Sequence, residues 1–541
     1  MLSKLHLVAD LPSCSDTTVA RDGMSISLDD PEKETCDPFL VKFDDVDPSN
    51  PKNWSNLHRW YLTMASGLLV LNASVSPHFI LLLLEHPYSA FTAHSPVPLV
   101  PAGIIQQLAE EFHMSQKEGV LTISLFVAGY CIGPLLWGPL SEQYGRRPLF
   151  IYTFLVYTAF QIAAALARNT ASILVFRFLG GVFAAAPLTN SGALISDVWD
   201  VKTRGKALAI FTVAPFAGPA LGPTIAGLIG ENTTWRWLFW ILALFAGFCC
   251  IIIVFTMPET YSPILLVRKA ESKRKETGDN RYYAPMEKDT MTTLQRAEHV
   301  LARPFVIFFQ EPMLIALTLY ISFVYGCIYL LFQAYPVVFT EGHHFSASSS
   351  GLMYLPIPIG GTLAVVIYVW IYNPKYEREV ERCAPNPVPP EFRLEIALIA
   401  GPLFAASFFW FAWTSSPSIS FWAPMSSGLL MGFSISWIFL GLFNYIVDAY
   451  ISVAASSLAS NTVIRSLFGA AFPLFTSDMY TTLGLRWATS LLGFIAIAMV
   501  PIPFVLQKFG PALRRKSKYS PTHDLPADIP ILEKQSDKSP L

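Results

Sequence analysis

Charged side chains are scarce in this chain. Asp, Glu, Lys and Arg make up 14% of its 541 residues, whereas 53% are hydrophobic, and the mean hydropathy is +0.44. A soluble domain carries about 25% charged residues, so a water-facing surface of this size cannot be built from so few. The composition excludes an ordinary soluble protein and predicts an integral membrane protein.

The marks of several other protein classes are missing too. The formal net charge is −2, and no basic domain suggests nucleic-acid binding. The seven cysteines are scattered, which predicts neither a zinc site nor a disulfide framework. The sequence has no Gly-x-x-x-x-Gly-Lys phosphate loop and no Gly-x-Ser-x-Gly elbow. We therefore expect no enzyme activity, no metal and no cofactor, so that uphill transport must draw on an ion gradient.

Long apolar blocks dominate what is present. Each is about 20 residues or longer and can cross ~30 Å of hydrocarbon as a helix, the form that satisfies its own backbone in lipid. The first begins at Trp60, and the others cover 120–140, 148–167, 172–195, 207–229, 236–257, 312–335, 350–372, 394–413, 420–443, 451–477 and 487–507. Six blocks on either side of a polar linker predict an all-α fold of twelve transmembrane helices in two six-helix halves.

The polar segments give the predicted boundaries and orientation. Inner loops would hold nine Lys and Arg residues and outer loops four, which places both termini and the linker in the cytosol. The sequon at Asn232 then falls in an outer loop and predicts glycosylation there. The expected parts are a tail over 1–58, a half over 59–257, a linker over 258–310, a half over 311–507 and a tail over 508–541.

A turn motif lies between the second and third blocks, from Gly138 to Pro148. Glu142 and Arg146 are four residues apart and could pair with each other or with charges on a neighbouring helix. Such a charged latch at the inner rim would favour one conformation over another. The alternative is a turn with a positive-inside anchor. The candidate latch residues are Gly138, Glu142, Gly145, Arg146 and Arg147.

The fifth block is rich in proline and glycine. Prolines remove backbone donors and kink a membrane helix, and glycines allow a second helix to approach closely. The alternative is an ordinary kinked helix. The residues concerned are Pro215, Gly218, Pro219, Gly222, Pro223 and Gly227.

These two motifs resemble the loop signature and the span-five antiporter signature of the major facilitator superfamily. Two positions depart from the loop signature, because Glu142 replaces the family aspartate and Gln143 the arginine after it. Further stretches, such as 47–55 and 258–261, resemble the fungal twelve-span drug:proton antiporters, the group of multidrug and polyamine exporters. The resemblance covers roughly 44–75 and 101–515 and implies proton-coupled exchange.

Buried charges and amides are the remaining candidates for a site. A charge facing lipid is costly, so Arg177 should face the bundle interior, pair at the outer rim or snorkel, whereas Arg465 sits deeper and has less escape by snorkelling. The resemblance implies a proton-coupling role for Arg177, and Arg465 is a further candidate for that role. Asp197 and Asp448 are the acidic candidates for proton coupling, with rim pairing or helix capping as the alternative. The candidates for a substrate path near the midplane are Asn72, Gln161, Asn190, Tyr325, Tyr329, Gln333, Asn444 and Asn461.

Residues 75–100 do not fit the pattern. They hold four prolines and three histidines between flanks that would otherwise join into a plausible first helix. Two interpretations stand open, a genuine outer-loop insertion or an intron retained in the gene model. Sequencing the transcript across this region decides between them.

The sequence predicts a secondary active transporter, and we expect a monomer in the plasma membrane that exports small amphipathic organic molecules in exchange for protons. Cargo could be drugs, toxins or a fungal secondary metabolite. The alternatives are a polyamine or nutrient transporter of the same fold, or a sensor or non-functional product because of the 75–100 insert. The scarcity of carboxylates within the blocks disfavours a polycationic cargo.

Overall fold

The computed structural model describes residues 37–44, 46–78, 111–230, 233–288, 293–384 and 386–520. Their regular secondary structure is helical, apart from one isolated bridge between Leu40 and Tyr283. The helices up to the linker are α1 (Asn56–His78), α3 (Gln116–Tyr144), α4 (Arg146–Ala165), α5 (Thr170–Val198), α6 (Val201–Phe211), α7 (Val213–Gly230) and α8 (Trp235–Thr256). The linker holds α9 (Ser262–Thr277) and α10 (Thr293–Gln310).

The second half follows the same plan. Its helices are α11 (Pro312–Pro336), α12 (Ala347–Leu352), α13 (Pro356–Ile367), α14 (Asn373–Cys383), α15 (Glu395–Thr414), α16 (Trp422–Ala449), α17 (Ala454–Met499) and α18 (Pro501–Lys516). Short turns of other helix types are η2 (Pro51–Asn53), η5 (Pro285–Lys288), η6 (Val337–Gly342), η7 (Tyr368–Tyr372), η8 (Pro390–Leu394) and η9 (Ile451–Val453).

Ten stretches of the described helices are long and apolar enough to cross a membrane. The last of them, Ala454–Lys516, covers α17 and α18. It contains two of the predicted spans, because α17 is broken at Gly484, whose φ of 73° and ψ of 151° no α-helix accommodates. The first predicted span, α1, has 23 residues and is not among the ten. The predicted number of twelve is reached only when α1 is added, so its crossing stays a prediction.

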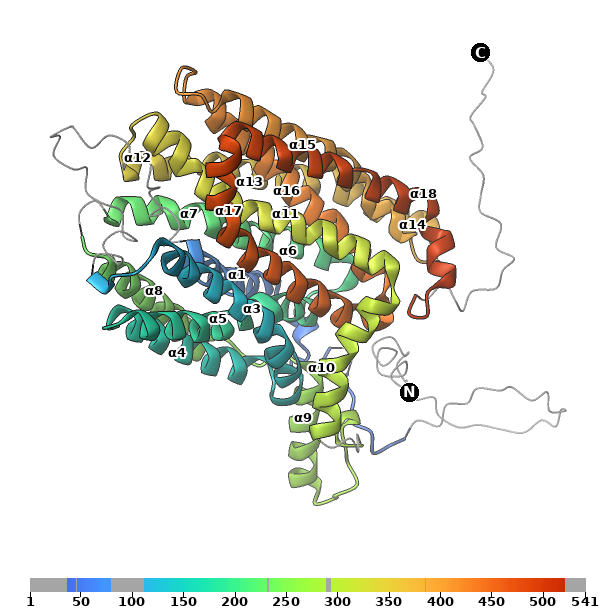
Figure 1. Cartoon of the computed structure of the whole chain (residues 1–541). Helices are drawn as coiled ribbons and strands as arrows, with labels where there is room; N and C mark the ends of the chain where they lie inside the picture. The colour runs from blue at the N-terminus through green and yellow to red at the C-terminus, as the bar shows by residue number, and fades with distance from the viewer. Residues whose placement is uncertain are drawn as a thin grey trace, which may run out of the picture.

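Equivalent helices pack on each other in the two halves. The second and fourth long helices pair as α3 with α5 and as α13 with α16, and the third and fourth pair as α4 with α5 and as α15 with α16. The first and fifth pair as α1 with α7 and as α11 with α17. Figure 1 shows the two halves as neighbouring layers, blue to green and yellow to red. This repeated packing is what two related halves require.

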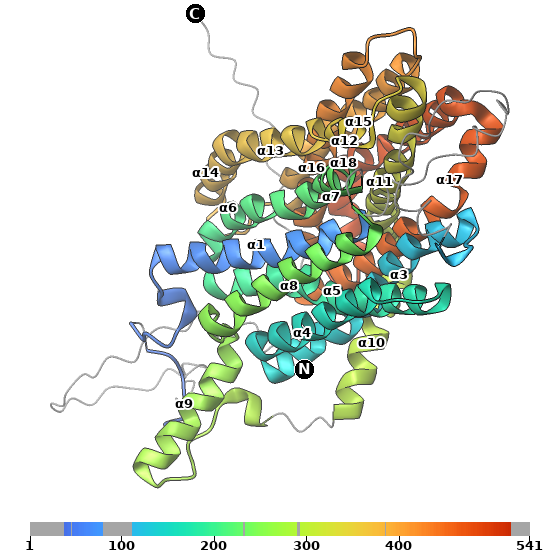
Figure 2. The same cartoon turned by 90° about the vertical axis from the view of Figure 1, so that its left-hand side faces the viewer.

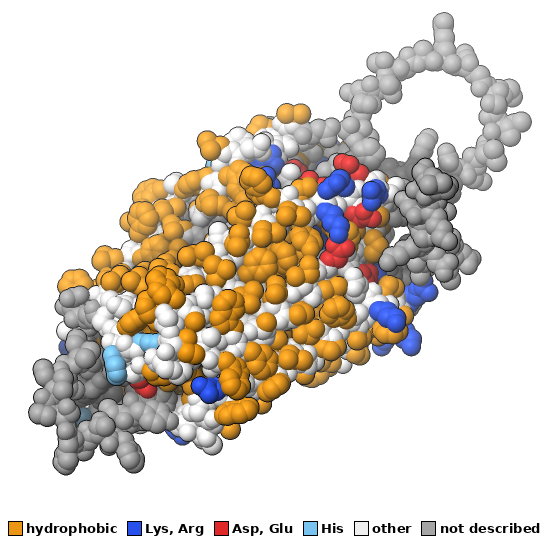
Figure 3. Space-filling view, turned by 90° about the horizontal axis from the view of Figure 1, so that it is seen from above, with side chains coloured by type: hydrophobic (Ala, Val, Ile, Leu, Met, Phe, Trp, Pro, Cys, Tyr) orange, Lys and Arg blue, Asp and Glu red, His pale blue; other side chains and the backbone are white. Residues whose placement is uncertain are grey.

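The surface suits lipid around its middle. Many large apolar side chains of the helices are exposed, among them Phe255, Leu244 and Trp370. Figure 3 shows apolar side chains across the middle of this face, with Lys, Arg, Asp and Glu gathered mostly at one end. In water such an extended apolar surface would drive association, so its natural environment is hydrocarbon.

The charged end of the bundle carries the linker and both ends of the described chain. Helices α9 and α10 project there from the transmembrane bundle (Figure 1, Figure 2). Lys269 of α9 binds Asp44 and Asp47 of the N-terminal segment, and the backbone N–H of Lys518 donates to Glu311 at the start of α11. The described ends of the chain therefore lie on the same face as the linker.

Two sequence predictions lie outside the described residues. Helix α1 ends at His78, so it includes only the first residues of the atypical 75–100 segment, and 79–100 are not described. The sequon residue Asn232 is not described either. The linker, expected only as a polar stretch, is largely helical.

Candidate functional site

The turn between α3 and α4 is built around Gly145. Its φ of 98° lies in the left-handed region that favours glycine. A Cβ at this position would lie 2.3 Å from Oε2 of Glu259. The residue therefore meets two demands at once, since it reverses the chain and leaves room for a carboxylate at the start of α4.

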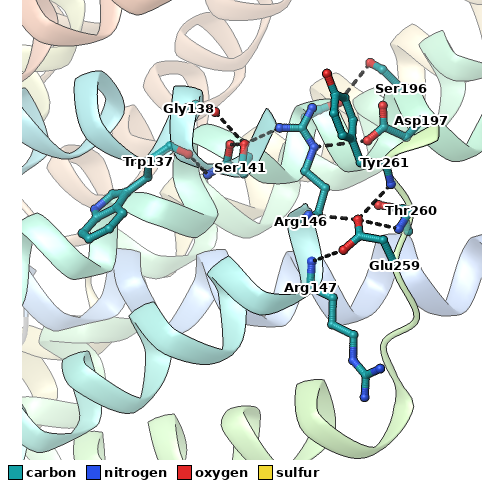
Figure 4. A network of polar contacts seen from close by, with 12 residues as sticks. Trp137, Gly138, Ser141, Arg146, Arg147, Ser196, Asp197, Glu259, Thr260 and Tyr261 are labelled. Carbon is teal, nitrogen blue, oxygen red and sulfur yellow. Dashed lines mark hydrogen bonds and ion pairs between the residues drawn. The ribbon is translucent and has the colours of Figure 1, made fainter. Parts of the chain in front are cut away.

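Glu259 caps that helix from a distant part of the chain. It follows α8 and is only 4% exposed. Its carboxylate accepts hydrogen bonds from the backbone N–H groups of Arg146 (2.9 Å), Arg147 (3.2 Å), Thr260 (3.0 Å) and Tyr261 (2.9 Å), as Figure 4 shows. An anion here satisfies the free N–H groups of the helix and its positive dipole end. The end of the sixth helix is thereby tied to the start of the third.

Arg146 reaches from the same point to α5. Its Nε donates to Oδ2 of Asp197 at 3.2 Å, a terminal nitrogen donates to Ser141, and the guanidinium lies 4.8 Å from the ring centre of Tyr261. Arg147 donates to the carbonyl of Val254 at 3.0 Å. Of the two alternatives for Arg146, the structure shows the pair with a neighbouring helix.

The network extends inward through Ser141 (Figure 4). The Ser141 hydroxyl contacts the carbonyl oxygen of Gly138 at 2.7 Å and Oδ1 of Asn190 at 2.8 Å. The amide of Asn190 donates to the carbonyls of Trp137 and Ala186, and the side chain is buried. Asn190, expected on a substrate path, thus lies inside the first half with its polar atoms engaged. Glu142, near the end of α3, is exposed.

The second half carries an equivalent ion pair. Nε of Arg393, in η8, donates to Oδ2 of Asp448 at 2.8 Å, and the guanidinium lies 3.5 Å from the ring centre of Tyr376. Arg146 and Arg393 both lie at the start of the third helix of their half, and Asp197 and Asp448 both lie near the end of the fourth. Asp197 and Asp448 are therefore both engaged in ion pairs at the charged end of the bundle.

A second ion pair in this half joins its last helix to the start of its third. Arg514 of α18 makes two hydrogen bonds to Glu391, at 3.0 and 2.7 Å, and both side chains are buried. In the first half the last helix is followed by the acid, Glu259, whereas in the second half the last helix supplies the base. Sequence reasoning assigned no role to Glu391, Arg514 or Glu259, and only Glu259 carried a signal, as part of the 258–261 motif.

Arg177 is compensated without a carboxylate. It is 1% exposed in α5, and its guanidinium donates to the carbonyl of Thr122 and to the carbonyl and hydroxyl of Ser76 at 3.1–3.2 Å. It also lies 4.1 Å from the ring centre of Phe126. Gln161 donates to the same Ser76 hydroxyl at 3.0 Å. Both candidates therefore hold the far end of α1 within the first half.

The glycine- and proline-rich motif occupies α7, which is separated from α6 at Thr212. A Cβ on Gly218 would lie 2.4 Å from Cβ of Ser74 in α1, and one on Gly227 would lie 2.4 Å from the carbonyl oxygen of Ala347 in α12. The predicted close approach of a second helix is thus present on both sides. The motif residues Pro215, Pro219, Gly222 and Pro223 lie in the same helix.

The two halves touch at the end of the bundle away from the ion pairs. The hydroxyl of Thr224 in α7 donates to the carbonyl of Gly351 in α12 at 2.8 Å, and Ser348 approaches the carbonyl of Gly227 at 3.4 Å. Lys117 at the start of α3 lies 3.8 Å from Asp478 of α17. Helices α3 and α7 of the first half are therefore closed against α17 and α12 of the second at this end.

Four further path candidates differ in how their amides are engaged. Those on α11 and α17 join these two helices, since Gln333 donates to the carbonyl of Pro473 and Asn461 to Thr318, each at 3.2 Å. Asn72 of α1 is fully buried, and neither polar atom of its amide has a hydrogen-bond partner among the described residues. Asn444 donates to the carbonyl of Leu440 within α16.

Tyr325, Tyr329 and Arg465 form a cluster in the second half. The two tyrosine hydroxyls on α11 are 3.0 Å apart. The guanidinium of Arg465 lies 4.7 Å from the ring centre of Tyr325 and 5.7–5.8 Å from those of Phe443 and Phe439 on α16. Three helices of the second half thus supply this cluster.

Two other features of the described residues were considered as sites. A groove of about 510 Å³ between α15 and the second part of α17 is lined by seven apolar residues, including Phe409 and Ile497. It has no polar group to orient a ligand. Within the described ranges, no group of three or more His, Cys, Asp or Glu side chains could hold a metal ion.

Comparison with known proteins decides the family. The model of the Major Facilitator Superfamily matches residues 90–473. The chain belongs to the major facilitator superfamily. This superfamily member is therefore a membrane transporter and not an enzyme, and the fold class expected from the sequence is confirmed.

The relatives of this superfamily member include named fungal exporters. The multidrug transporter mdrA of Aspergillus fumigatus is 40% identical over 490 residues, which are 90% of this chain and 77% of that protein. The efflux pump FUBT of Fusarium oxysporum is 41% identical over 491 residues, covering 90% and 79%. The citrinin biosynthesis cluster transporter mrr1 of Monascus ruber is 39% identical over 501 residues, covering 91% and 94%. The predicted resemblance to fungal drug exporters is confirmed.

A solved structure agrees on the fold. The human organic anion transporter MFSD10 superposes with a TM-score of 0.56 over 83% of this chain and 100% of that chain, at 18% identity. At this level of identity the likeness concerns the fold alone.

Proposed function

We propose that this superfamily member exports small amphipathic organic molecules across the plasma membrane in exchange for protons, with no bound cofactor. The observation that carries the proposal is the position of the α7 motif. Gly218 contacts α1 of its own half, and Gly227 contacts α12 of the other half. The signature that resembles drug:proton antiporters therefore lies where the two halves must separate during alternating access. The names of the relatives, which include multidrug transporters and efflux pumps, support the direction of transport.

The conformational cycle follows from the contacts at the two ends. The contacts of α7 with α12 and of α3 with α17 close the outer end of the bundle in this structure. The pairs Arg146–Asp197 and Arg393–Asp448 lie within single halves. We propose that they act as the latch of this state, in which the outer end is closed, with Arg146 and its partners as the latch of the first half.

Proton coupling is proposed at Asp197 and Asp448. Each acid accepts a hydrogen bond from an arginine. Protonation of either acid would remove the charge that holds its arginine and loosen the packing of the third helix against the fourth in that half. Arg177 has only carbonyl and hydroxyl oxygens as hydrogen-bond acceptors among the described residues. We therefore assign Arg177 to the structure of the first half and not to proton carriage.

Topology and assembly complete the proposal. The described ends and the basic linker lie on one face, and the excess of Lys and Arg in the loops of that face supports a cytosolic position for it. We propose a monomer, because each half buries its own ion pairs. Glycosylation at Asn232 on the outer side remains part of this proposal.

Dye accumulation in cells expressing the full tagged chain tests the proposal. Carboxyfluorescein and rhodamine 6G serve as anionic and cationic probes. Expression should lower accumulation of at least one dye, and a protonophore should restore it. Gly227→Leu should abolish this effect, because its side chain would meet the carbonyl of Ala347. The matched control is Gly247→Leu in α8, where an added Cβ meets open space.

Two outcomes would count against the proposal. Unchanged accumulation of both dyes, with the tagged chain visible at the plasma membrane, would contradict export of amphipathic dyes. Lowered accumulation that a protonophore leaves intact would retain export and contradict proton coupling.

A further inference from the structure

Arginines buried within the helical bundle need compensation, and the described residues show how most of them receive it. Arg146, Arg393 and Arg514 each pair with a carboxylate. Arg177 donates to three backbone or hydroxyl oxygens. The desolvation cost of a guanidinium in hydrocarbon makes such partners necessary.

Arg465 is the exception. Its Nε is buried and has no hydrogen-bond partner, and the described residues give the side chain no ion pair. The terminal nitrogens also make no hydrogen bond to the described residues, and they are not among the buried atoms. The side chain is half-buried. The terminal nitrogens of its guanidinium are therefore accessible to a ligand.

The depth of Arg465 excludes simple escape to water at the rim. It lies about a dozen residues into α17, which at 1.5 Å per residue is on the order of 16 Å from the inner end of that helix. An arginine side chain spans less than half of that distance. A cation at this depth, with its terminal nitrogens open, can take a counter-charge that arrives from outside the protein.

The surroundings of Arg465 suit an aromatic ligand. The ring faces of Tyr325, Phe439 and Phe443 lie 4.7–5.8 Å from the guanidinium. They attract the cation but accept none of its N–H groups in conventional hydrogen bonds. The same faces can stack on a flat ligand. The paired hydroxyls of Tyr325 and Tyr329 add a polar edge.

The cluster also faces the other half. Tyr130 of α3, in the first half, lies within electrostatic reach of Tyr325 and Tyr329. Helices α3 and α17 pack on each other across the boundary between the halves. Arg465 therefore lies close to the surface along which the halves separate, where a substrate path is expected.

We infer that Arg465 is the binding site for the negative charge of the substrate, and that the substrates of this transporter are aromatic organic anions such as carboxylates. The inference rests on the proposed function and specifies its substrate class. A carboxylate would take the two open N–H groups of the guanidinium as a fork, with its ring against Tyr325 and Phe443. This narrows the expected small amphipathic cargo to molecules that carry a negative charge.

Ligand binding tests the inference directly. Purified full-length protein in lipid nanodiscs is titrated with radiolabelled naphthalene-2-carboxylate and with naphthalene-2-carboxamide, its uncharged analogue of similar shape. The wild type should bind the carboxylate at least ten-fold more tightly than the amide. Arg465→Gln should bring that ratio close to one, and Arg465→Lys should leave an intermediate value because lysine keeps the charge but loses the fork.

The chain offers a matched control in the same helix. Arg486 also lies over an aromatic ring, 5.2 Å from the ring centre of Trp413, but it is exposed beyond Gly484. Arg486→Gln should leave the carboxylate preference unchanged. A wild-type ratio near one, or an unchanged preference in Arg465→Gln, would overturn the inference.

A second measurement does not depend on the folding of a variant. Phenylglyoxal modifies accessible arginines, and mass spectrometry reports the rate at Arg465 in the wild type. The carboxylate should slow this reaction several-fold and the amide should not, whereas equal protection would refute the inference. Binding is measured without a gradient, so a failure of proton-coupled export leaves this result standing, and the reverse holds too.

Discussion

Asp197→Asn is the sharpest perturbation of the charged network. Asp197 and Arg146 have side chains only 18% and 6% exposed, and their atoms approach to 3.2 Å. Removing one partner of a buried ion pair costs about 3–5 kcal/mol, because the remaining charge stays buried without its counter-charge. Arg146 keeps Ser141 and the ring of Tyr261, so we expect the lower end of that range, about 3 kcal/mol.

The double variant separates charge burial from lost packing. In Arg146→Gln/Asp197→Asn neither side chain is charged, and two amides can still form a hydrogen bond. We expect it to be destabilised by roughly 1–2 kcal/mol, less than either single variant, because the desolvation penalty disappears with the charges. The coupling free energy in the cycle would then exceed ~2 kcal/mol.

The double-mutant cycle compares the wild type, the two single variants and the double variant. Unfolding in mixed micelles with increasing SDS, followed by tryptophan fluorescence, measures the stability of each. The exposed pair Lys117–Asp478, with side chains 82% and 69% exposed at 3.8 Å, is the control. Its cycle should show no resolvable coupling, since water screens both charges. Additive losses at Arg146 and Asp197 would refute the reasoning, because they would mean that the two side chains contribute independently.

Two further predictions concern the charged end of the bundle. Glu259→Gln should lower the unfolding free energy by about 1–3 kcal/mol in the same assay, since one backbone N–H of α4 loses its acceptor, whereas exposed Glu381→Gln should change nothing. Burial raises the pKa of Asp47, but hydrogen bonds from Lys269 and Ser49 and the Lys269 charge outweigh it and hold that pKa below its ordinary value. The contact between the N-terminal segment and α9 is therefore fully stabilised above roughly pH 5 and weakens as the pH falls through about 4. Hydrogen-exchange protection of the Val41 amide should be constant from pH 8 to 5 and fall below that; a steady loss across that range would contradict it.

Hydropathy predicted the long helices because each must satisfy its own backbone hydrogen bonds in lipid. Block 148–167, for example, corresponds closely to α4 at Arg146–Ala165. It could not predict the ion pairs. Arg146 and Asp197 are 51 residues apart, and Arg146 and Glu259 are 113 apart. Which of several rim acids meets which arginine depends on how the helices pack, and local periodicity carries no information on that.

The linker shows the same limit. Its polar composition predicted a cytosolic stretch, and it is largely helical because α9 finds a partner in the N-terminal segment. Lys269 joins Asp44 and Asp47, and the backbone of Val41 pairs with Tyr283. These contacts link segments more than 200 residues apart, so the contact could not be predicted from the sequence of either segment.

The distribution of compensated charge connects the fold with transport. At the charged end of the bundle each half ties its own helices together with acids, since Asp197, Asp448 and Glu391 pair with arginines and Glu259 accepts backbone N–H groups. Deeper in the bundle, Arg177 is satisfied by carbonyls and is fixed, whereas Arg465 is not. An uncompensated charge favours whichever state admits a counter-charge. In the proposed mechanism, substrate binding and proton release would act on the same equilibrium, because each changes the charge balance that the moving halves must bury.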